Sequence, residues 1–315
     1  MSAPSPRPQS DIVARLRAAG CVFAEDEAQL LRSAARTPAE LAAMVDKRAA
    51  GLPLEQVVGW AGFCGLRIAV EPGVFVPRHR TEFLVRQAVA LARQAAGLAG
   101  PAASGSRRLV VVDLCCGAGA VGAALNAALD GVELYAADID PAAVRCARRN
   151  VGAGARVYEG DLYDPLPATL RGRVDILAAN VPYVPTGQIG LLPPEARLHE
   201  PRVALDGGCD GLDVMRRVTA AAPYWLARGG SMLVETSGRQ APRALETIAR
   251  AGLIPRVASS DELNATVVIG TRPARPAARK SAAEAGHDDR AGQLAQRLAR
   301  QRDLGTPDAA ADHHP

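Results

Sequence analysis

The chain has 315 residues, of which 48% are hydrophobic and 22% charged, with a formal net charge of +4. These values are typical of a globular protein and exclude fibrous and disordered classes. The charge-free stretch Leu114–Leu129 is shorter than the roughly 20 residues of a membrane span, so no transmembrane helix is expected. The N-terminus lacks the apolar core of a secretory signal, and the scattered cysteines form no disulfide framework. A cytoplasmic location is therefore predicted.

The first fifty residues predict three short helices. Ser10 can cap the first helix, and Glu25–Arg36 forms the second. The third begins at the capping box Thr37–Glu40, which has proline at the first helical position, and ends at Gly51. Residues 1–56 are therefore expected to form a helical N-terminal domain.

The pattern then changes to alternating apolar and polar residues. Between Val57 and Pro77 this alternation, broken at Glu71–Gly73, predicts a hairpin within a connector of residues 57–80. A helix over Thr81–Ala96 and a loop over Gly97–Ser106 follow.

From Leu109 onward, short apolar runs alternate with helical stretches, which is typical of an α/β fold with a mostly parallel sheet. The predicted strands are Leu109–Leu114, Val132–Asp138, Arg156–Asp161, Val174–Ala179, Ser231–Thr236 and Asn264–Thr271. The predicted helices are Gly119–Leu129, Pro141–Asn150, Gly211–Ala227 and Gln240–Ala251. This domain spans residues 81–273, and residues 274–315, poor in large apolar side chains, predict a disordered tail.

The first strand of this domain leads into a glycine-rich loop. Gly117, Gly119 and Gly122 satisfy the G-x-G-x-x-G pattern, and Asp138 stands where a carboxylate holding ribose hydroxyls is expected. Glycines also occur in such loops simply for packing. Asp113 would repel the pyrophosphate of NAD but suits the cationic amino acid end of S-adenosyl-L-methionine (SAM). SAM is therefore the predicted cofactor, unless Asp113 only caps the following turn.

A second motif, Asn180-Val181-Pro182-Tyr183, follows the strand Val174–Ala179. The carboxyl ends of strands in an open α/β sheet face the ligand crevice. Pro182 keeps the preceding residue extended, so the Asn180 side chain and the Val181 carbonyl offer two acceptors beside an aromatic ring. Such a site suits a planar amino group on an sp² carbon, although the tetrapeptide also reads as a simple turn.

These motifs together resemble the HemK-type SAM-dependent methyltransferases, the peptide-chain release factor N5-glutamine methyltransferases, which carry Asn-Pro-Pro-Tyr at this place. The resemblance covers about Pro53–Pro273, and its most specific part is Glu200–Asp213. The other segments that carry it are Gly65–Ile68, Pro72–Arg78, Asp113–Gly119, Ala137–Asp140, Gly160–Pro167, Leu226–Gly230 and Glu235.

The resemblance implies a Rossmann-like SAM-dependent methyltransferase domain and a small helical domain that binds the protein substrate. The implied substrate is the glutamine of a Gly-Gly-Gln motif in a release factor, with Asn180, Val181, Pro182 and Tyr183 as catalytic residues. The residues implied to bind SAM are Asp113, Cys115, Gly117, Gly119, Asp138, Asp161, Leu162 and Asn180. In two places the chain departs from the family pattern, since Cys115 replaces a loop glycine and Val181 replaces the first proline.

Three alternative functions remain open. An amino-methyltransferase acting on a nucleic-acid base would be expected to carry a basic stripe, which the sequence lacks. An NAD-dependent enzyme would need a proton-transfer residue near the strand ends, for which the folded part offers only His79 and His199. A non-catalytic paralogue that binds SAM or a partner is kept open by Cys115 and Val181. No metal site and no direct nucleic-acid contact are predicted.

Overall fold

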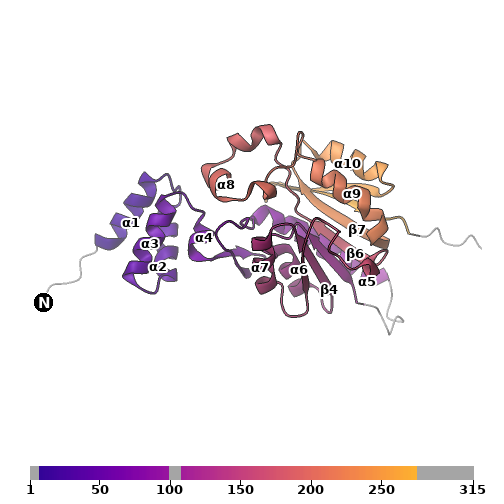
Figure 1. Cartoon of the computed structure of the whole chain (residues 1–315), viewed down its shortest axis with the longest axis horizontal. Helices are drawn as coiled ribbons and strands as arrows, with labels where there is room; N and C mark the ends of the chain where they lie inside the picture. Colours follow the sequence, from indigo (N-terminus) through magenta and orange to yellow (C-terminus); the bar gives the residue numbers. More distant parts are fainter. Residues whose placement is uncertain (1–6, 99–107, 275–315) are drawn as a thin grey trace, which may run out of the picture. The chain divides into compact units, whose positions relative to one another are not determined.

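The computed structural model describes residues 7–98 and 108–274 (Figure 1). The predicted tail lies outside the described residues except for Ala274, and so does the predicted loop from Ala99 to Ser106. No helix within the two described ranges is long and apolar enough to cross a membrane.

Three N-terminal helices are confirmed: α1 (Arg7–Ala18), α2 (Ala24–Ala34) and α3 (Pro38–Ala49). The prediction that Ser10 caps the first helix is wrong, because α1 begins before it. At the start of α3 the Thr37 hydroxyl accepts the N–H of Glu40, as predicted, at 3.1 Å. The Glu40 carboxylate instead accepts the N–H of Arg36, so the capping box is only half formed. A short helix, α4 (Leu54–Val58), was not predicted.

The predicted hairpin is present as strands β1 (Trp60–Phe63) and β2 (Leu66–Ala69), which pair antiparallel. Its turn is formed by Cys64 and Gly65, both in the left-handed region with φ of 49° and 76°. Two-residue hairpin loops favour this geometry because it matches the twist of the strands. The break at Glu71–Gly73 is a second turn beyond β2, closed by a bond from the Val74 N–H to the Glu71 carbonyl.

The central sheet has seven strands in the order β5-β4-β3-β6-β7-β9-β8. Their bounds are β3 (Val110–Leu114), β4 (Glu133–Asp138), β5 (Arg156–Glu159), β6 (Val174–Ala179), β7 (Leu226–Thr236), β8 (Ile254–Ser260) and β9 (Ala265–Thr271). Only β9 runs against its neighbours, which confirms the mostly parallel α/β fold. The edge strand β8 was missed because its residues are largely exposed and lack the apolar alternation of a half-buried strand.

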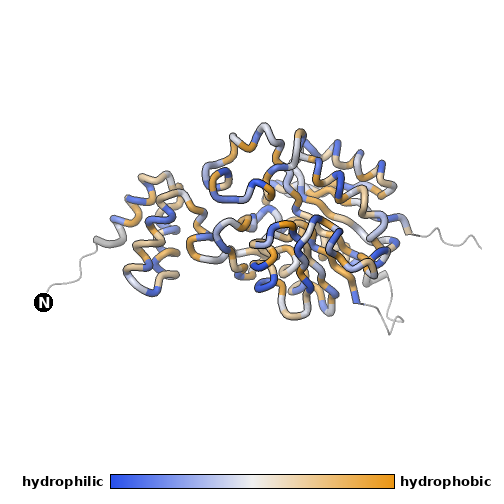
Figure 2. The backbone as a smooth tube through the Cα atoms, viewed as in Figure 1, coloured by the Kyte–Doolittle hydropathy of each residue, from blue (hydrophilic) through white to orange (hydrophobic). Residues whose placement is uncertain are grey.

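Helices cover both faces of this sheet, and its apolar strands lie between them (Figures 1 and 2). Side chains of successive strand residues point to opposite faces, so Val111 joins one core cluster while Val110 and Val112 join the other. The first cluster includes α5 (Glu82–Leu98), α6 (Ala120–Ala128) and α7 (Pro141–Asn150), and the second includes α9 (Asp213–Trp225) and α10 (Ala241–Arg250). The strand order reverses between β3 and β6, where α/β sheets bind ligands.

Shorter elements complete the described chain. They are the helix α8 (Pro194–His199) and the 3₁₀ turns His79–Thr81, Ala168–Leu170, Thr186–Leu191 and Arg202–Ala204. None of them was predicted, because elements of one or two turns carry too little apolar periodicity to be recognised.

Candidate active site

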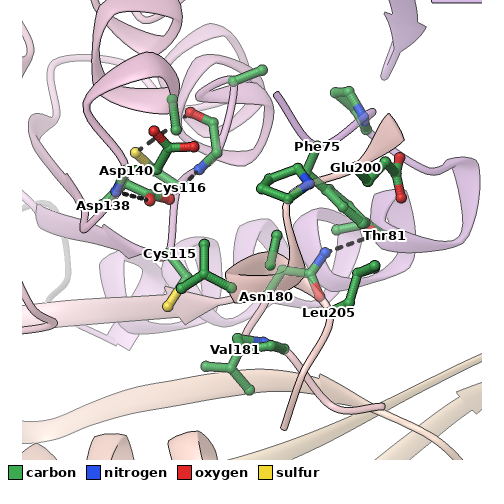
Figure 3. A pocket seen from close by; sticks show the side chains of 18 of the residues that line it. Phe75, Thr81, Cys115, Cys116, Asp138, Asp140, Asn180, Val181, Glu200 and Leu205 are labelled. Carbon is green, nitrogen blue, oxygen red and sulfur yellow. Dashed lines mark hydrogen bonds between the residues drawn. The ribbon is translucent and has the colours of Figure 1, made fainter. Parts of the chain in front are cut away.

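A cavity of about 640 Å³ lies at the carboxyl ends of β3, β4 and β6 (Figure 3). Every predicted site residue except Gly119 lines it, namely Asp113, Cys115, Gly117, Asp138, Asp161, Leu162, Asn180, Val181, Pro182 and Tyr183. Figure 3 shows Asp138 and Cys116 toward one end, and Phe75, Thr81 and Asn180 toward the other. After the ligands that the sequence predicts for their residues, we call these the cofactor end and the acceptor end.

The loop that follows β3, residues Cys115–Gly119, is held from β4. One carboxylate oxygen of Asp138 accepts the N–H of Gly117 at 2.8 Å, and the other accepts the N–H of Asp140 at 2.9 Å. Burial raises the pKa of Asp138, while these two bonds oppose the rise. The carboxylate predicted to bind a ribose therefore also fixes the shape of this loop, which we call the cofactor loop.

Cys115 occupies the position where the family pattern has glycine. Its φ of 53° lies in the left-handed region, which side chains with a Cβ adopt only at some cost. The side chain is partly exposed to the cavity and packs on the second core cluster, so the loop tolerates it without closing. Burial raises the pKa of the Cys115 thiol, which is therefore neutral at physiological pH.

Gly119 does not line the cavity. It precedes α6 with a φ of 77°, and a Cβ there would lie 2.9 Å from Val151 Cγ1 and 3.0 Å from the Cα of Ala147. Contacts this short would force α6 and α7 apart. Packing, one of the two readings of the glycine pattern, therefore accounts for this residue.

Asp113 both caps a helix and lines the cavity. Its Oδ2 accepts the N–H of Gly122, in the first turn of α6, at 2.8 Å. Burial raises the pKa of Asp113 to about 7; the bond from Gly122 opposes this rise, and the nearby Asp138 adds to it. Because this pKa is close to physiological pH, a positively charged ligand nearby would shift Asp113 toward its ionised form.

Asp161 is already ion-paired. Arg217 of α9, which the sequence did not suggest, approaches its Oδ2 to 2.5 Å, and both side chains line the cavity. The next residue, Leu162, has a φ of 49°, which turns the backbone sharply beside this pair.

At the acceptor end, two oxygen atoms, Asn180 Oδ1 and the carbonyl oxygen of Val181, receive no hydrogen bond in the described part of the chain. Asn180 Nδ2 donates to the Thr81 hydroxyl at 3.4 Å (Figure 3). Neither atom has a donor in the described part of the chain, and the role of both as acceptors for a ligand stays a prediction.

Tyr183 is fixed by a buried carboxylate. Its hydroxyl donates to Glu235 Oε1 at 3.0 Å, and the Arg80 Nε lies 3.3 Å from the same oxygen. Burial raises the pKa of Tyr183, and the charge of Glu235 raises it further, so the phenol stays neutral. The other oxygen of Glu235 is buried without a hydrogen-bond partner among the described residues. The ring of Tyr183 therefore presents a fixed aromatic surface to the cavity.

The tetrapeptide is also supported from behind by the glycine-rich segment Glu200–Asp213. A Cβ on Gly207 would lie 2.7 Å from the Pro182 carbonyl oxygen, and one on Gly211 would lie 2.3 Å from the Tyr183 oxygen. Gln240 Nε2 donates to that Tyr183 carbonyl at 2.9 Å. These glycines are required because backbone packs directly against backbone there.

Sequence reasoning missed several residues that line the cavity or support it from behind, as Glu235 does. Glu200 is fully buried, accepts the N–H of Val76 at 3.2 Å and pairs with Arg78 at 2.5 Å. Burial raises the pKa of Glu200, and the Arg78 guanidinium opposes the rise. Arg78, Glu200 and Glu235 lay within segments that carried the family resemblance, but nothing in the spacing assigned them a role. Thr81 and Arg80 carried no sequence signal.

Comparison with known proteins finds related methyltransferases. Residues 102–191 match the family model "Methyltransferase small domain". The chain is 36% identical over 241 residues to the release factor glutamine methyltransferase of Geobacter sulfurreducens, covering 75% of this chain and 79% of the relative. It is 37% identical over 238 residues to that of Mycolicibacterium smegmatis, covering 74% and 79%.

Two further matches are more distant in function or in sequence. A Streptomyces pristinaespiralis protein, named 4-amino-L-phenylalanine/4-methylamino-L-phenylalanine methyltransferase, is 37% identical over 62% of this chain and 65% of its own. The catalytic domain of hMettl16, solved in complex with the MAT2A 3'UTR hairpin 6, superposes with a TM-score of 0.51 at 13% identity. That match covers 74% of this chain and 84% of the other, and it supports the fold alone.

Proposed function

The chain belongs to the release factor glutamine methyltransferases, enzymes whose methyl donor is SAM, and from this premise we propose what its cavity does. The enzyme transfers the methyl group of SAM to the side-chain nitrogen (N5) of a protein glutamine, in the Gly-Gly-Gln motif of a peptide-chain release factor. The observation that carries this proposal is the pair of unused acceptors, Asn180 Oδ1 and the Val181 carbonyl, beside the fixed ring of Tyr183.

The cofactor end fits SAM chemically. SAM carries two positive charges and a ribose with two hydroxyls, and the carboxyl groups that line the cavity include those of Asp113, Asp138 and Asp161. Apolar side chains such as Val121 and Leu162 also line it and suit the adenine ring. When bound, SAM supplies an electrophilic methyl group on its sulfonium.

The residues of the acceptor end orient a weak nucleophile. The lone pair on the nitrogen of a glutamine side chain is delocalised into the carbonyl group, which makes this nitrogen a weak nucleophile. The site must therefore orient the nitrogen toward the methyl group. Asn180 Oδ1 and the Val181 carbonyl accept its two hydrogens, and Tyr183 packs on the amide plane. Such orientation is worth about 7–11 kcal/mol in favourable cases. The same two acceptors stabilise the positive charge that develops on nitrogen as the methyl group moves from sulfur to nitrogen. S-adenosyl-L-homocysteine leaves, and the methylated nitrogen releases one proton to water.

We also propose that residues 1–56 bind the acceptor protein and that residues 57–80 connect them to the methyltransferase domain, residues 81–273. The protein is proposed to act in the cytoplasm, where translation takes place.

The decisive test is methyl transfer to a release factor. We expect labelled methyl from SAM to enter a release factor and to be lost when the glutamine of its Gly-Gly-Gln motif is changed to alanine. Free 4-amino-L-phenylalanine is the comparison acceptor, because one relative is named for that substrate. Label that persists in the Gln→Ala release factor would show that this glutamine is not the acceptor. Label that enters neither the parent release factor nor its Gln→Ala variant would show that a release factor is not the substrate.

Val181→Pro tests how the tetrapeptide works. If this position supplies only its backbone carbonyl, proline keeps or raises the rate, because it fixes φ and organises the acceptor in advance. The side chain of Val181 is buried, so the variant's thermal unfolding midpoint is measured together with its rate on the release factor. A rate that falls while the midpoint is unchanged would show that the valine side chain or its N–H is used.

The affinity for SAM is expected to depend on pH through Asp113. In the free protein its pKa is raised to about 7, so the carboxyl is mostly protonated at pH 6. A cationic ammonium beside it favours the carboxylate, and binding below pH 7 therefore releases a proton. The Kd for SAM should fall as pH rises from 5.5 to 7 and then level off, as measured by calorimetry. In Asp113→Asn this dependence should disappear, and its persistence there would assign the proton to another group.

A further inference from the structure

One side chain outside the cavity joins two segments that line it. Asn150 is the last residue of α7. Its Oδ1 accepts the N–H of Ala69 at 2.9 Å, and its Nδ2 donates to the carbonyls of Ala69 at 2.9 Å and Ala118 at 2.8 Å. Both donor hydrogens of this amide and one of its acceptor positions are therefore engaged.

Of the two partners of Asn150, Ala118 lines the cavity, whereas Ala69 does not line it and precedes by six residues Phe75, which does. Ala118 lies in the cofactor loop, next to Gly117. Ala69 ends β2, and the chain that leaves the hairpin reaches the acceptor end at Phe75 and continues to Thr81, the partner of Asn180. Asn150 thus stands between the part of the chain that faces the cofactor and the part that leads to the acceptor.

We propose that Asn150 is a positioning residue that couples the cofactor loop to the β1–β2 hairpin, so that occupancy of the cofactor end orders the hairpin and the chain that follows it. This inference rests on the proposed function only in taking SAM as the ligand of the cofactor loop.

Besides the packing of Gly119 against Ala147 and Val151, two backbone N–H groups hold the cofactor loop in place. The Gly117 N–H is held by Asp138, and the Cys116 N–H is held by the Ala137 carbonyl at 3.1 Å. Both of these attachments come from β4. Among the described residues, the Asn150 side chain is the one that bonds both to this loop, at Ala118, and to β2, at Ala69; the thiol of Cys146, one turn earlier in α7, also donates to the Ala69 carbonyl at 3.0 Å. Coupling is reciprocal, so an ordered hairpin must in turn favour the loop conformation that binds SAM.

The first measurement is the affinity for SAM alone, by calorimetry. Asn150→Ala should raise the Kd about tenfold, the effect of losing one or two net hydrogen bonds. Asn150→Asp has the same shape but lacks both donors, so it should weaken binding at least as much. The matched control is Asn126→Ala. Asn126 Nδ2 donates at 3.3 Å to the carbonyl of Val151, the residue after Asn150, so this variant removes a similar amide hydrogen bond at the same end of α7 but none to Ala69 or Ala118. This control should keep the Kd within about twofold. Equal Kd values for the parent and both Asn150 variants would overturn the proposal.

The second measurement follows the hairpin itself. Trp60 pairs with Ala69 across the hairpin, and the Arg67 guanidinium lies 4.2 Å from its ring centre, so its emission is sensitive to the hairpin's conformation. The chain has two tryptophans, and Trp225→Phe leaves Trp60 as the only one. In this background SAM should change the emission of Trp60, and adding Asn150→Ala should abolish the change even at saturating SAM.

A change in Trp60 emission that survives in Asn150→Ala, or that never occurs in the parent, would overturn the coupling. Hydrogen exchange of residues 60–69 gives the same readout in a chain that retains Trp225, should the Trp225→Phe background be unstable. SAM should slow this exchange in the parent and in Asn126→Ala but not in Asn150→Ala. None of these readouts uses a release factor, so a failure of methyl transfer would leave the coupling standing and would count only against the proposed acceptor.

Discussion

Replacing Asn180 by alanine is expected to lower the rate of methyl transfer at least 100- to 1000-fold, roughly the effect of removing one oriented catalytic hydrogen-bonding group. Its Oδ1 is one of two acceptors that aim the amide nitrogen, and the Val181 carbonyl alone leaves the amide free to rotate. The Kd for SAM should change less than about threefold, because the contact of Asn180 is with Thr81 at the acceptor end. The measurements are kcat with a release factor and calorimetric binding of SAM.

Thr81→Val is the matched control for Asn180→Ala. It removes the hydroxyl that receives the Asn180 Nδ2 hydrogen but leaves Oδ1 in place. The rate should therefore fall by a smaller factor, about tenfold, the cost of one net hydrogen bond that orients the side chain. A loss of SAM affinity in Asn180→Ala as large as its loss of rate would place Asn180 in the cofactor site and contradict the acceptor role.

Asp138→Ala is expected to weaken SAM binding about 100-fold. A hydrogen bond to a charged group contributes about 1.5–3 kcal/mol, and each 1.4 kcal/mol is a factor of about ten in Kd. The variant loses the acceptor proposed for the ribose hydroxyls and also releases the N–H of Gly117, which that carboxylate holds at 2.8 Å. Both losses act on the cofactor end, and calorimetry with SAM measures their sum.

Asp140→Ala separates this effect from a general loss of stability. Asp140 also lines the cavity, but its carboxylate caps α7 by accepting the N–H of Ala142 at 2.8 Å. Loss of such a cap costs about 1 kcal/mol of stability, so the unfolding midpoint should fall while the Kd for SAM changes much less than in Asp138→Ala. If Asp138→Ala bound SAM as tightly as the parent, the cofactor loop would not be the SAM site.

The α/β fold and the cofactor end were predictable because each depends on residues close together in the chain. The apolar run Val174–Ala179 ends in the tetrapeptide, and parallel strands bring their carboxyl ends to one edge of the sheet. For the same reason the strand pattern alone places Asp113 and Asp138, on neighbouring strands, beside one cavity. The hairpin was also predicted, but the position of its turn was not. The turn begins at Cys64, which has a positive φ, and cysteine is not a residue type that indicates this conformation.

The sequence by itself thus determined the type of sheet and the edge at which the cavity lies, and it supplied the tetrapeptide that we propose faces the acceptor, since strand periodicity and strand-end motifs are local properties. The tertiary structure alone decided which distant residues support that tetrapeptide. Thr81 lies 99 positions before Asn180, and Glu235 lies 52 positions after Tyr183. Gly207 is needed because its backbone packs against Pro182, and Asn150 reaches Ala69 across 81 positions. Contacts of this kind depend on how separate elements pack in space, and packing leaves no periodic pattern in the chain.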